Sequence, residues 1–333
     1  MSNAQFKELF QRHENNPIIT VKDFPYPANS VFNAGATSFG GEALLLMRVE
    51  DRRGISHLTT ARSEDGIGNW RIHDRPTLIP SPETNPEEIW GIEDPRITFL
   101  EELKLWAITY TAYSKSGPLV SLATTVDFGD FERLGPIMPP EDKDAALFPV
   151  RIKGRWAMLH RPVSTFHATG AHIWISYSPD LKHWGDHRIL IPARKGGWWD
   201  AHKVGISPPP LQTDEGWLLL YHGVKRTASG AIYRLGLALL DLEDPCWVIA
   251  RSDEWVFQPE EGYEVFGDVD KVVFPCGWII DGDTVQIYYG GADKCIALAT
   301  ASISELLQWL KEHKSFTRKY QTTFQTFRGN LPP

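Results

Sequence analysis

The stretch "HLTTARSEDG", residues 57–66, is an apolar strand-forming run that ends in small and hydroxylated residues and then turns. Four further segments repeat this pattern: VSLATTVDFG (120–129), IWISYSPDLK (173–182), LGLALLDLED (235–244) and IALATASISE (296–305). When Ser63, Thr125, Ser178, Asp241 and Ser302 are aligned, successive copies lie 62, 53, 63 and 61 residues apart. A strand motif that recurs at such a spacing indicates a protein built from repeated β-sheet units.

Two more strand-forming segments precede each copy. The nearer segment has the alternation and the β-branched or aromatic residues of a strand that pairs with the copy. The five nearer segments are ALLLMRVED (43–51), LWAITYTAYS (105–114), WAMLHRP (156–162), WLLLYHGVK (217–225) and VQIYYGGADK (285–294). The farther segments are VFNAGAT (31–37), GIEDPRITFL (91–100), DAALFPVRI (144–152), HKVGISPPPLQ (202–212) and VDKVVFPCGWII (269–280). Their position predicts the innermost strand of each unit.

Five units that share a core only with their neighbours predict an all-β fold, a closed five-bladed β-propeller. Helical periodicity is confined to residues 5–14 and 303–313, so we expect short terminal helices. We predict one catalytic propeller domain over residues 1–315, including an N-terminal helix, and a polar C-terminal tail over residues 316–333. The amphipathic terminal helices are candidate contact faces for a homo-oligomer.

The composition limits the classes of partner. The chain of 333 residues is 42% hydrophobic and contains 13 Trp, enough for a large core. Its net charge of −8, without blocks of like charge, argues against nucleic acid and anionic membranes as partners. Cys246, Cys276 and Cys295 are expected to be reduced, and no metal-binding spacing is present. Without a signal-like or membrane-spanning apolar run, we expect a cytoplasmic protein with a small-molecule substrate and no cofactor.

Polar residues gather where the predicted inner strands begin, and these strands line the channel of a propeller. The starts of the inner strands carry Asn33, Glu93, Asp94, Lys143, Asp144, His202, Lys203, Asp268 and Asp270. The ends of the second strands add Arg48, Glu50, Tyr110, His160, Arg161, Tyr221, His222 and Asp293. We predict the functional site at this channel. Structural roles are the alternatives: Asp94 as a turn residue before Pro95, and Glu93 as a partner of Arg96.

Carboxylates together with Trp and Tyr indicate sugar chemistry, because an acid can protonate a glycosidic oxygen while aromatic faces stack on rings. Arg161, Lys203 and His222 are expected from three different blades, yet on the same channel as Asp94. Arg offers a planar fork of donors and Lys a point charge, which suits phosphate. Alternatively, these cations only balance nearby Asp residues.

Nine motifs in order resemble those of glycoside hydrolase family 130. They are VFNAGAT (31–37), LMRVEDRRGISHL (46–58), GIEDPRI (91–97), DKDAALFPVRIKGRWAMLHRP (142–162), SPDLKHWG (178–185), DAHKVGISPPPL (200–211), GWLLLYHGV (216–224), IYRLGLALLDLEDP (232–245) and YYGGAD (288–293). Members of this family are five-bladed propellers that act on β-mannosides as inverting phosphorylases or, in some branches, as hydrolases. The resemblance therefore implies the same fold and substrate class for this chain.

The resemblance implies that Asp94 is the catalytic acid. Its proton would pass through the 3-hydroxyl of the mannosyl unit to the scissile oxygen while phosphate attacks C1 from the opposite face. The product would be α-mannose 1-phosphate, and inorganic phosphate would be a co-substrate. From the residues, enclosure by Trp90 and neighbouring carboxylates is expected to raise the proton affinity of Asp94.

The resemblance also assigns the binding residues. Asn33, Arg48 and Asp293 would contact the mannosyl unit, and Lys203 would lie between sugar and phosphate; Arg161, His222 and Tyr233 would hold the phosphate. One departure is Ala34, where relatives carry a hydroxylated residue after the Asn. Segments 81–91 and 225–231 are candidate loops for recognition of the acceptor sugar, with exposed connections as the alternative.

Phosphorolysis is favoured over hydrolysis because phosphate is already a negatively charged nucleophile, so the enzyme needs cations where a hydrolase needs a base. The main alternative is an inverting β-mannosidase that cleaves β-1,2- or β-1,4-mannosides with water, with Glu50 or Asp144 as base. A third hypothesis is a non-catalytic sugar-binding propeller.

Overall fold

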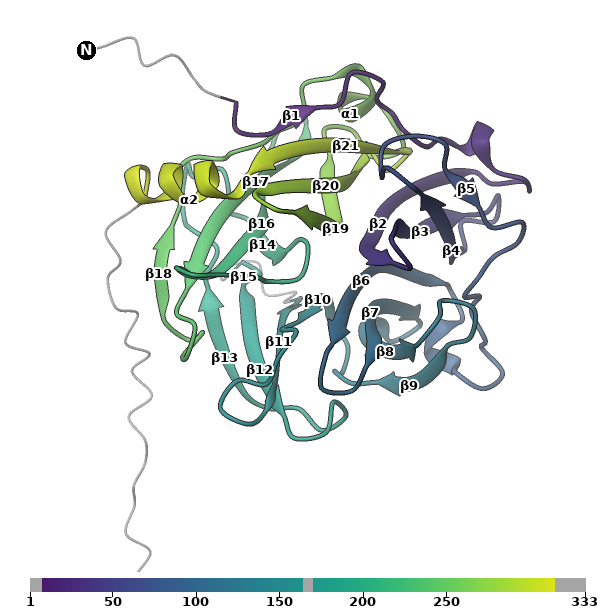
Figure 1. Cartoon of the computed structure of the whole chain (residues 1–333), viewed down its shortest axis with the longest axis horizontal. Coiled ribbons are helices and arrows are strands. Elements are labelled where there is room, and N and C mark those ends of the chain that lie inside the picture. Colours follow the sequence, from purple (N-terminus) through teal and green to yellow (C-terminus); the bar gives the residue numbers. More distant parts are fainter. Residues whose placement is uncertain (1–7, 164–169, 315–333) are drawn as a thin grey trace, which may run out of the picture.

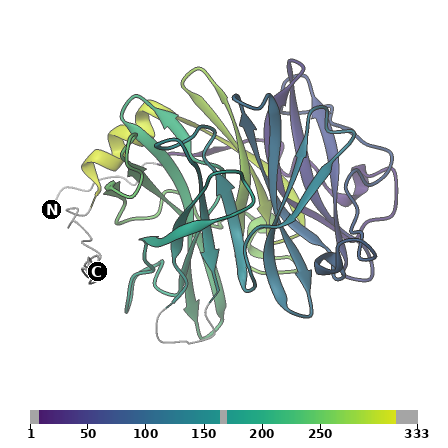
Figure 2. The same cartoon turned by 90° about the horizontal axis from the view of Figure 1, so that it is seen from below.

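Five antiparallel sheets surround a central axis in the computed structural model, which describes residues 8–163 and 170–314. Figure 1 looks along this axis, and the chain passes from one sheet to the next around the ring. In the turned view the sheets stand side by side, with their strands running between two faces covered by loops (Figure 2). The predicted five-bladed β-propeller is confirmed. The predicted tail, residues 316–333, lies outside the described residues.

Each blade is formed mainly by strands consecutive in the chain, and its first strand is innermost. Blade 1 contains β2 (Ser30–Phe39), β3 (Glu42–Glu50), β4 (Ser56–Ser63) and β5 (Arg71–Ile72), and blade 2 contains β6 (Ile92–Leu100), β7 (Leu105–Ser114), β8 (Gly117–Thr125) and β9 (Glu132–Pro136). Blade 3 contains β10 (Asp142–Leu147), β11 (Trp156–Pro162), β12 (Ile173–Ser178) and β13 (Gly185–Ile191). Blade 4 contains β14 (Lys203–Ile206), β15 (Leu211–Thr213), β16 (Gly216–Thr227), β17 (Gly230–Leu240) and β18 (Val248–Arg251). Blade 5 contains β19 (Val273–Asp281), β20 (Thr284–Gly291), β21 (Cys295–Ser302) and β1 (Gln11–Arg12).

The repeated motif that identifies the blades is a capped turn. Ser63, Thr125 and Ser302 end their strands, and the side-chain oxygen of each accepts the backbone N–H three residues further on. Asp241 follows β17 directly and accepts the N–H of Asp244 in the same way, at 2.8 Å. Small oxygen-bearing side chains satisfy backbone donors where a strand ends, which explains their recurrence at each copy.

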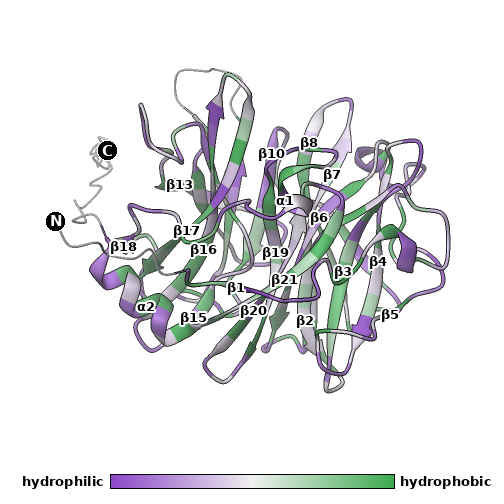
Figure 3. Ribbon diagram, turned by 90° about the horizontal axis from the view of Figure 1, so that it is seen from above, coloured by the Kyte–Doolittle hydropathy of each residue, from purple (hydrophilic) through white to green (hydrophobic). Residues whose placement is uncertain are grey.

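Both faces of each middle strand are buried, because blades pack against blades. On β3, Leu44 and Leu46 pack in the cluster shared with blade 2, whereas Leu45 and Met47 pack in the cluster shared with blade 5. All four side chains are fully buried. The uninterrupted apolar run on this strand therefore follows from alternate side chains entering two different interfaces. Hydrophobic residues run along the strands in Figure 3, and many connecting loops are hydrophilic.

The predicted N-terminal helix is wrong over its described part, because residues 8–14 contain no helix and Gln11–Arg12 form β1. β1 pairs with β21 and completes blade 5, so the start of the chain joins its last blade and closes the ring. Leu9 and Phe10, which suggested a helical face, are buried in the cluster between blades 4 and 5. Pairing with an open strand edge outweighs local helix propensity here.

The predicted C-terminal helix is confirmed as α2 (Ile303–Glu312). Ser302 caps its first turn, and Leu306, Leu307 and Leu310 are buried against the outer strands. The short helix α1 (Gly262–Val265) precedes the inner strand of blade 5, and two single 3-10 turns lie at Val21–Asp23 and Pro86–Glu88. Among the described residues, no helix has both the length and the apolar character to span a membrane.

A buried ion pair stabilises the contact between the N-terminal segment and blade 5 that closes the ring. Arg12 donates from Nε to Glu264 Oε1 and from Nη2 to Glu264 Oε2, both at 2.9 Å. Glu264 is fully buried and also accepts a hydrogen bond from Tyr289 at 2.7 Å. The guanidinium lies 4.3 Å from the ring centroid of Phe257. A bidentate pair inside the protein therefore ties the N-terminal segment to blade 5.

Replacing Arg12 with Ala is expected to lower the free energy of unfolding by about 3 kcal/mol, because it leaves the Glu264 carboxylate buried without its cation. Urea denaturation followed by circular dichroism measures this change. Arg53→Ala is the control, since Arg53 pairs with Asp51 on the surface and its side chain is 75% exposed. Equal midpoints for the two variants would contradict a structural role of the closure pair.

Candidate active site

The inner strands of blades 1, 2 and 3 carry the same backbone irregularity near their starts. The pairing register shifts between Phe32 and Gly35, between Glu93 and Arg96, and between Lys143 and Ala146. Within these shifts Asn33, Asp94 and Asp144 have φ values of 49°, 51° and 52°. Asn and Asp tolerate this left-handed conformation better than most residues, and a bulge redirects a side chain. The repeated bulge thus explains why each of these strands carries an Asn or Asp there.

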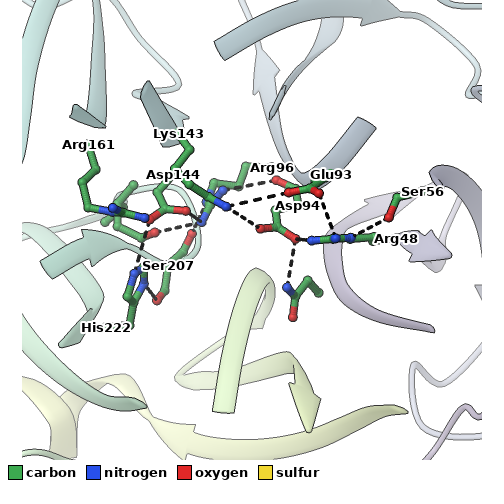
Figure 4. Close-up of polar contacts among 12 residues, drawn as sticks. Arg48, Ser56, Glu93, Asp94, Arg96, Lys143, Asp144, Arg161, Ser207 and His222 are labelled. Carbon is green, nitrogen blue, oxygen red and sulfur yellow. Dashed lines mark hydrogen bonds and ion pairs between the residues drawn. The ribbon is translucent and has the colours of Figure 1, made fainter. Parts of the chain in front are cut away.

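Asp94 lies at the centre of the first group of polar side chains (Figure 4). Its Oδ1 accepts hydrogen bonds from Asn33 Nδ2 at 2.9 Å and from Arg48 Nη1 at 3.1 Å. Lys143 Nζ lies 3.9 Å from Oδ2. The carboxyl is almost fully buried, and it is the meeting point of three blades.

The expectation of a raised proton affinity for Asp94 is wrong. Burial raises the pKa of this carboxyl, but the charges of Arg48 and Lys143 and the hydrogen bond from Asn33 together outweigh it. The pKa of Asp94 therefore lies below its usual value. Trp90, which was expected to enclose the carboxyl, is 43% exposed at the rim of blade 2. Asp94 is therefore a carboxylate at neutral pH.

Glu93 also belongs to this group, and it does not pair with Arg96 as the structural alternative suggested. Arg48 Nη2 donates to Glu93 Oε1 at 2.9 Å, and Lys143 Nζ lies 3.8 Å from Oε2. Arg48 thus bridges both acids, and its Nε donates to Ser56 Oγ at 2.9 Å. The adjacent carboxylates share two cations, which holds them in fixed positions.

A second group surrounds Asp144, which is fully buried (Figure 4). Arg161 Nε donates to Asp144 Oδ2 at 2.7 Å, and His222 Nε2 lies 3.3 Å from the same oxygen. Gly205 permits this approach, because a Cβ there would lie 2.5 Å from both Asp144 Oδ2 and the His222 ring. Burial raises the pKa of Asp144, but Arg161 and His222 dominate and hold it well below the ordinary value. Lys143 lies between the two groups in Figure 4.

Arg96 links the two groups. It is 1% exposed and donates from Nε to the carbonyl of Ser207 at 2.6 Å and from Nη2 to that of Ile206 at 3.0 Å. Its Nη1 donates to the Asp94 carbonyl at 3.2 Å, and Nη2 lies 3.6 Å from Asp144 Oδ1. One guanidinium therefore connects the inner strands of blades 2 and 4. Arg96 was not among the predicted site residues, although its position two residues after Asp94 on the same strand pointed to it.

Arg161, Lys203 and His222 come from two blades and not from three, because β14 and β16, which carry Lys203 and His222, are paired strands of blade 4. Lys203 Nζ lies 5.0 Å from the centroid of the Tyr233 ring. Burial, together with the charges of Arg161 and Lys143, lowers the pKa of Lys203 to about 7. Burial likewise lowers the pKa of His222 to about 4, although Asp144 opposes the shift. His222 is therefore a neutral hydrogen-bonding group at neutral pH.

Tyr233 and Asp293 complete the set of predicted residues. The Tyr233 ring lies 6.0 Å from the His222 ring, and burial raises the pKa of its phenol. Asp293 lies in the turn between β20 and β21 with φ of 53°. Burial raises the pKa of Asp293 to about 7 against the opposing charge of Arg48. All eight predicted site residues thus lie among the inner-strand starts and the neighbouring strand ends and turns.

Several other residues predicted at the channel point elsewhere. Tyr110 donates to Glu88 at 2.8 Å, His160 bonds to Asp142 at 2.6 Å and Tyr221 donates to Asp200 at 3.2 Å, all within blades. His160 and Tyr221 directly precede Arg161 and His222, and successive side chains of a strand point to opposite faces. Glu50 is near Asn29, with 3.4 Å between Oε1 and Nδ2, and Asp268 and Asp270 are exposed before β19.

The arrangement can bind an uncharged polar group beside Asp94 and an anion beside Arg161, Lys143 and Lys203. Between residues 8 and 163 and from 170 to 314, no cluster of His, Cys, Asp and Glu is arranged to hold a metal ion. The side chains of the two groups can transfer protons and stabilise negative charge electrostatically.

Comparison with known proteins agrees with this chemistry. A family model described as beta-1,4-mannooligosaccharide phosphorylase matches residues 7–312. A beta-1,4-mannooligosaccharide phosphorylase of Ruminococcus albus is 34% identical, covering 94% of each chain. A 1,2-beta-oligomannan phosphorylase of Thermoanaerobacter sp. is 38% identical, covering 89% of this chain and 98% of that protein. The solved structure of beta-1,2-mannobiose phosphorylase from Listeria innocua, with beta-1,2-mannobiose, matches with a TM-score of 0.84 at 33% identity, covering 91% of this chain and 99% of that one.

Proposed function

This chain belongs to glycoside hydrolase family 130, and from that membership we propose that it cleaves β-mannosides by inverting phosphorolysis, releasing α-D-mannose 1-phosphate. The substrates are a manno-oligosaccharide and inorganic phosphate. The observation that carries the proposal is the pairing of an acid, Asp94, with a separate group of cations, linked through Lys143. A sugar-binding protein without activity would have no need of the second group.

The sugar side is assigned to the first group. Asp94 is the acid, and its proton passes through the 3-hydroxyl of the mannosyl unit to the oxygen that leaves C1. Arg48 and Asn33 hold the carboxyl in place, at 3.1 and 2.9 Å, and offer donors to the sugar. Asp293, whose pKa burial raises to about 7, is a hydrogen-bonding partner for a mannosyl hydroxyl. Ala34, adjacent to Asn33, contributes no hydroxyl to this contact.

The phosphate side is assigned to the second group. Arg161 has Nε committed to Asp144, which leaves its other nitrogens as donors in a fixed orientation. His222 and Tyr233 supply further polar contacts, and Lys203 lies between sugar and phosphate. Phosphate attacks C1 from the face opposite the leaving oxygen, so one C–O bond forms as the other breaks and the configuration inverts. Asp144 acts as a positioning residue for the cluster.

The same geometry disfavours water as the nucleophile. Of the two carboxylates considered as bases for a hydrolase, Asp144 is held well below its ordinary pKa by Arg161 and His222, and a weak base activates water poorly. Glu50 is the last residue of β3, and its carboxylate lies near Asn29. The linkage is left open between β-1,2 and β-1,4, since similar proteins carry both names. We also propose a cytoplasmic location and no cofactor.

Product analysis with and without phosphate tests the reaction. Incubation of β-1,4- and β-1,2-linked manno-oligosaccharides with the enzyme is expected to yield mannose 1-phosphate only when phosphate is present. Chromatography of the products also identifies the linkage that is cleaved. Equal cleavage in phosphate-free buffer, with free mannose as product, would overturn phosphorolysis in favour of hydrolysis.

The affinity for phosphate is expected to weaken as pH rises above about 7. The Lys203 ammonium has a pKa lowered to about 7, so it is charged below that pH and neutral above it, and only the charged form attracts phosphate. The KM for phosphate should therefore increase severalfold between pH 7 and pH 9, more than the KM for the mannoside. Lys203→Arg should flatten this dependence, because Arg stays protonated over the whole range. An identical pH dependence of the KM for phosphate in the wild type and in Lys203→Arg would contradict the assignment of Lys203 to phosphate binding.

A further inference from the structure

We propose that blade 4 carries a second carbohydrate-binding site beside the channel, which holds distal sugar units of a manno-oligosaccharide whose reacting end occupies the central site. The inference rests on the proposed substrate class. It goes beyond the central site in assigning a function to a separate pocket of about 570 Å³. Three Trp side chains line this pocket, Trp198, Trp199 and Trp255, together with charged groups that include Lys225, Arg234 and Glu254.

The aromatic side chains are held in place before any ligand binds. The guanidinium of Arg194 lies 4.3 Å from the centroid of the Trp198 ring and is itself ion-paired to Asp200 at 3.2 Å. Arg234 lies 4.2 Å from the Trp255 ring in the same manner. Trp198 nevertheless remains 43% exposed. A rigid, partly exposed indole beside polar groups is suited to stacking on a sugar ring.

The pocket opens on the same face of the ring as the central site. β14 begins at Lys203 in the site, β16 runs antiparallel to it, and β17 is antiparallel to β16. The end of β16 and the start of β17 therefore lie at the site's face, and they contribute Lys225 and Arg234 to the pocket. Figure 1 shows β14, β16 and β17 side by side in blade 4.

One hairpin forms a wall of both sites. Tyr233 pairs with Val224 on one face of the β16–β17 hairpin, and Tyr233 contacts Lys203 in the central site. Arg234 pairs with Gly223 on the other face, where a Cβ at Gly223 would lie 2.4 Å from the Trp199 ring. A chain of sugars that leaves the central site over this hairpin would therefore reach the pocket on its far side.

The charges around the pocket favour a neutral ligand. Lys225 donates to the carbonyl of Gly197 at 2.9 Å, and both acidic and basic side chains line the pocket. A ligand with a strong net charge would be repelled by one of the two sets, whereas sugar hydroxyls can donate to carboxylates and accept from cations. The mixed rim therefore fits an uncharged oligosaccharide better than a nucleotide or a peptide of one charge.

Chain-length dependence of the kinetics tests the pocket. Trp198→Ala is expected to lower kcat/KM for mannotetraose about five- to tenfold through loss of one stacking contact, and to leave mannobiose and the KM for phosphate unchanged. Trp247→Ala is the matched control: Trp247 is 54% exposed on the same blade, in the turn that joins the opposite ends of β17 and β18. The control should behave like wild type at both chain lengths.

Two outcomes would contradict the proposed second carbohydrate-binding site. Equal loss for mannobiose and mannotetraose would place the effect in the central site, and a change of oligomeric state on sedimentation, without chain-length dependence, would make the pocket a protein interface. Calorimetric titration of mannotetraose and mannobiose into Asp94→Asn protein, with and without Trp198→Ala, tests binding without turnover. A selective loss of mannotetraose affinity there would support the pocket even if phosphorolysis failed.

Discussion

Replacing Asp94 with Asn is expected to reduce kcat for phosphorolysis of manno-oligosaccharides about 1000-fold, the scale of general acid catalysis by a positioned side chain. The carboxamide keeps the shape of the side chain and can still accept hydrogen bonds from Asn33 and Arg48, but its N–H groups are far too weakly acidic to transfer a proton through the 3-hydroxyl to the leaving oxygen. Steady-state release of mannose 1-phosphate measures the loss, and circular dichroism checks that the propeller remains folded.

A substrate whose leaving group needs no proton distinguishes proton donation by Asp94 from sugar binding by Asp94. A nitrophenyl β-mannoside has a leaving group that departs without protonation, so Asp94→Asn should lose far less activity on it than on mannobiose. Asp268→Asn is the control, because Asp268 is exposed in the loop before β19 and should retain full activity on both substrates. Equal losses on both substrates would show that Asp94 binds the sugar without acting as the acid.

Replacing Arg161 with Ala is expected to raise the KM for phosphate about 100-fold, since hydrogen bonds to charged groups each contribute roughly 1.5–3 kcal/mol. The substitution also leaves Asp144 without its 2.7 Å partner, so a buried carboxylate would repel the incoming anion. Initial rates over a range of phosphate concentrations at saturating mannoside measure the change. The KM for the mannoside should change much less.

Arg151→Ala is the matched control for this experiment. Arg151 belongs to the same blade but pairs on the surface with Glu102, whose carboxylate accepts from its Nε at 2.9 Å. The control should leave both KM values at the wild-type level. If Arg161→Ala raised the two KM values equally, Arg161 would be a general organiser of the site and not a phosphate ligand.

The lowered pKa of Asp94 has a consequence for how the two substrates cooperate. Arg48 and Lys143 keep the carboxyl ionised, whereas an acid catalyst must carry a proton. We expect bound phosphate to add negative charge close to Lys143 and so to raise the pKa of Asp94. Phosphate would then prepare the acid as well as attack C1, and the acid would lose its proton again when the site empties.

Much of the fold was readable from local patterns. The capped turns at Ser63, Thr125 and Ser302 recur because each strand end must satisfy its own backbone donors, and that need is local. By contrast, residues 8–14 have a helical pattern but contain a strand, since the free edge of β21 is created by residues almost 300 positions away.

The same contrast holds for the site: some of its features have local causes that the sequence shows, and others depend on contacts between distant residues. The motif around Asp94 and its relatives at Asn33 and Asp144 was visible as a repeated Asn or Asp at the start of an inner strand. Which of two neighbouring strand residues faces the channel was not assigned, so His160 was grouped with Arg161 and Tyr221 with His222. The choice depends on the pairing register of β11 and β16, which is set by contacts within whole blades.

Residue identity and spacing therefore specified five blades, the family and a set of polar side chains at the channel, because strand alternation, turn capping and bulge formation act over a few residues. The charge states and the hydrogen-bonding partners of these side chains were decided only by the folded structure. The pKa of Asp94 falls and that of Asp293 rises because electrostatic energy depends on distance and burial in space, and blades remote in sequence bring Arg48 and Lys143 each within 4 Å of the Asp94 carboxylate.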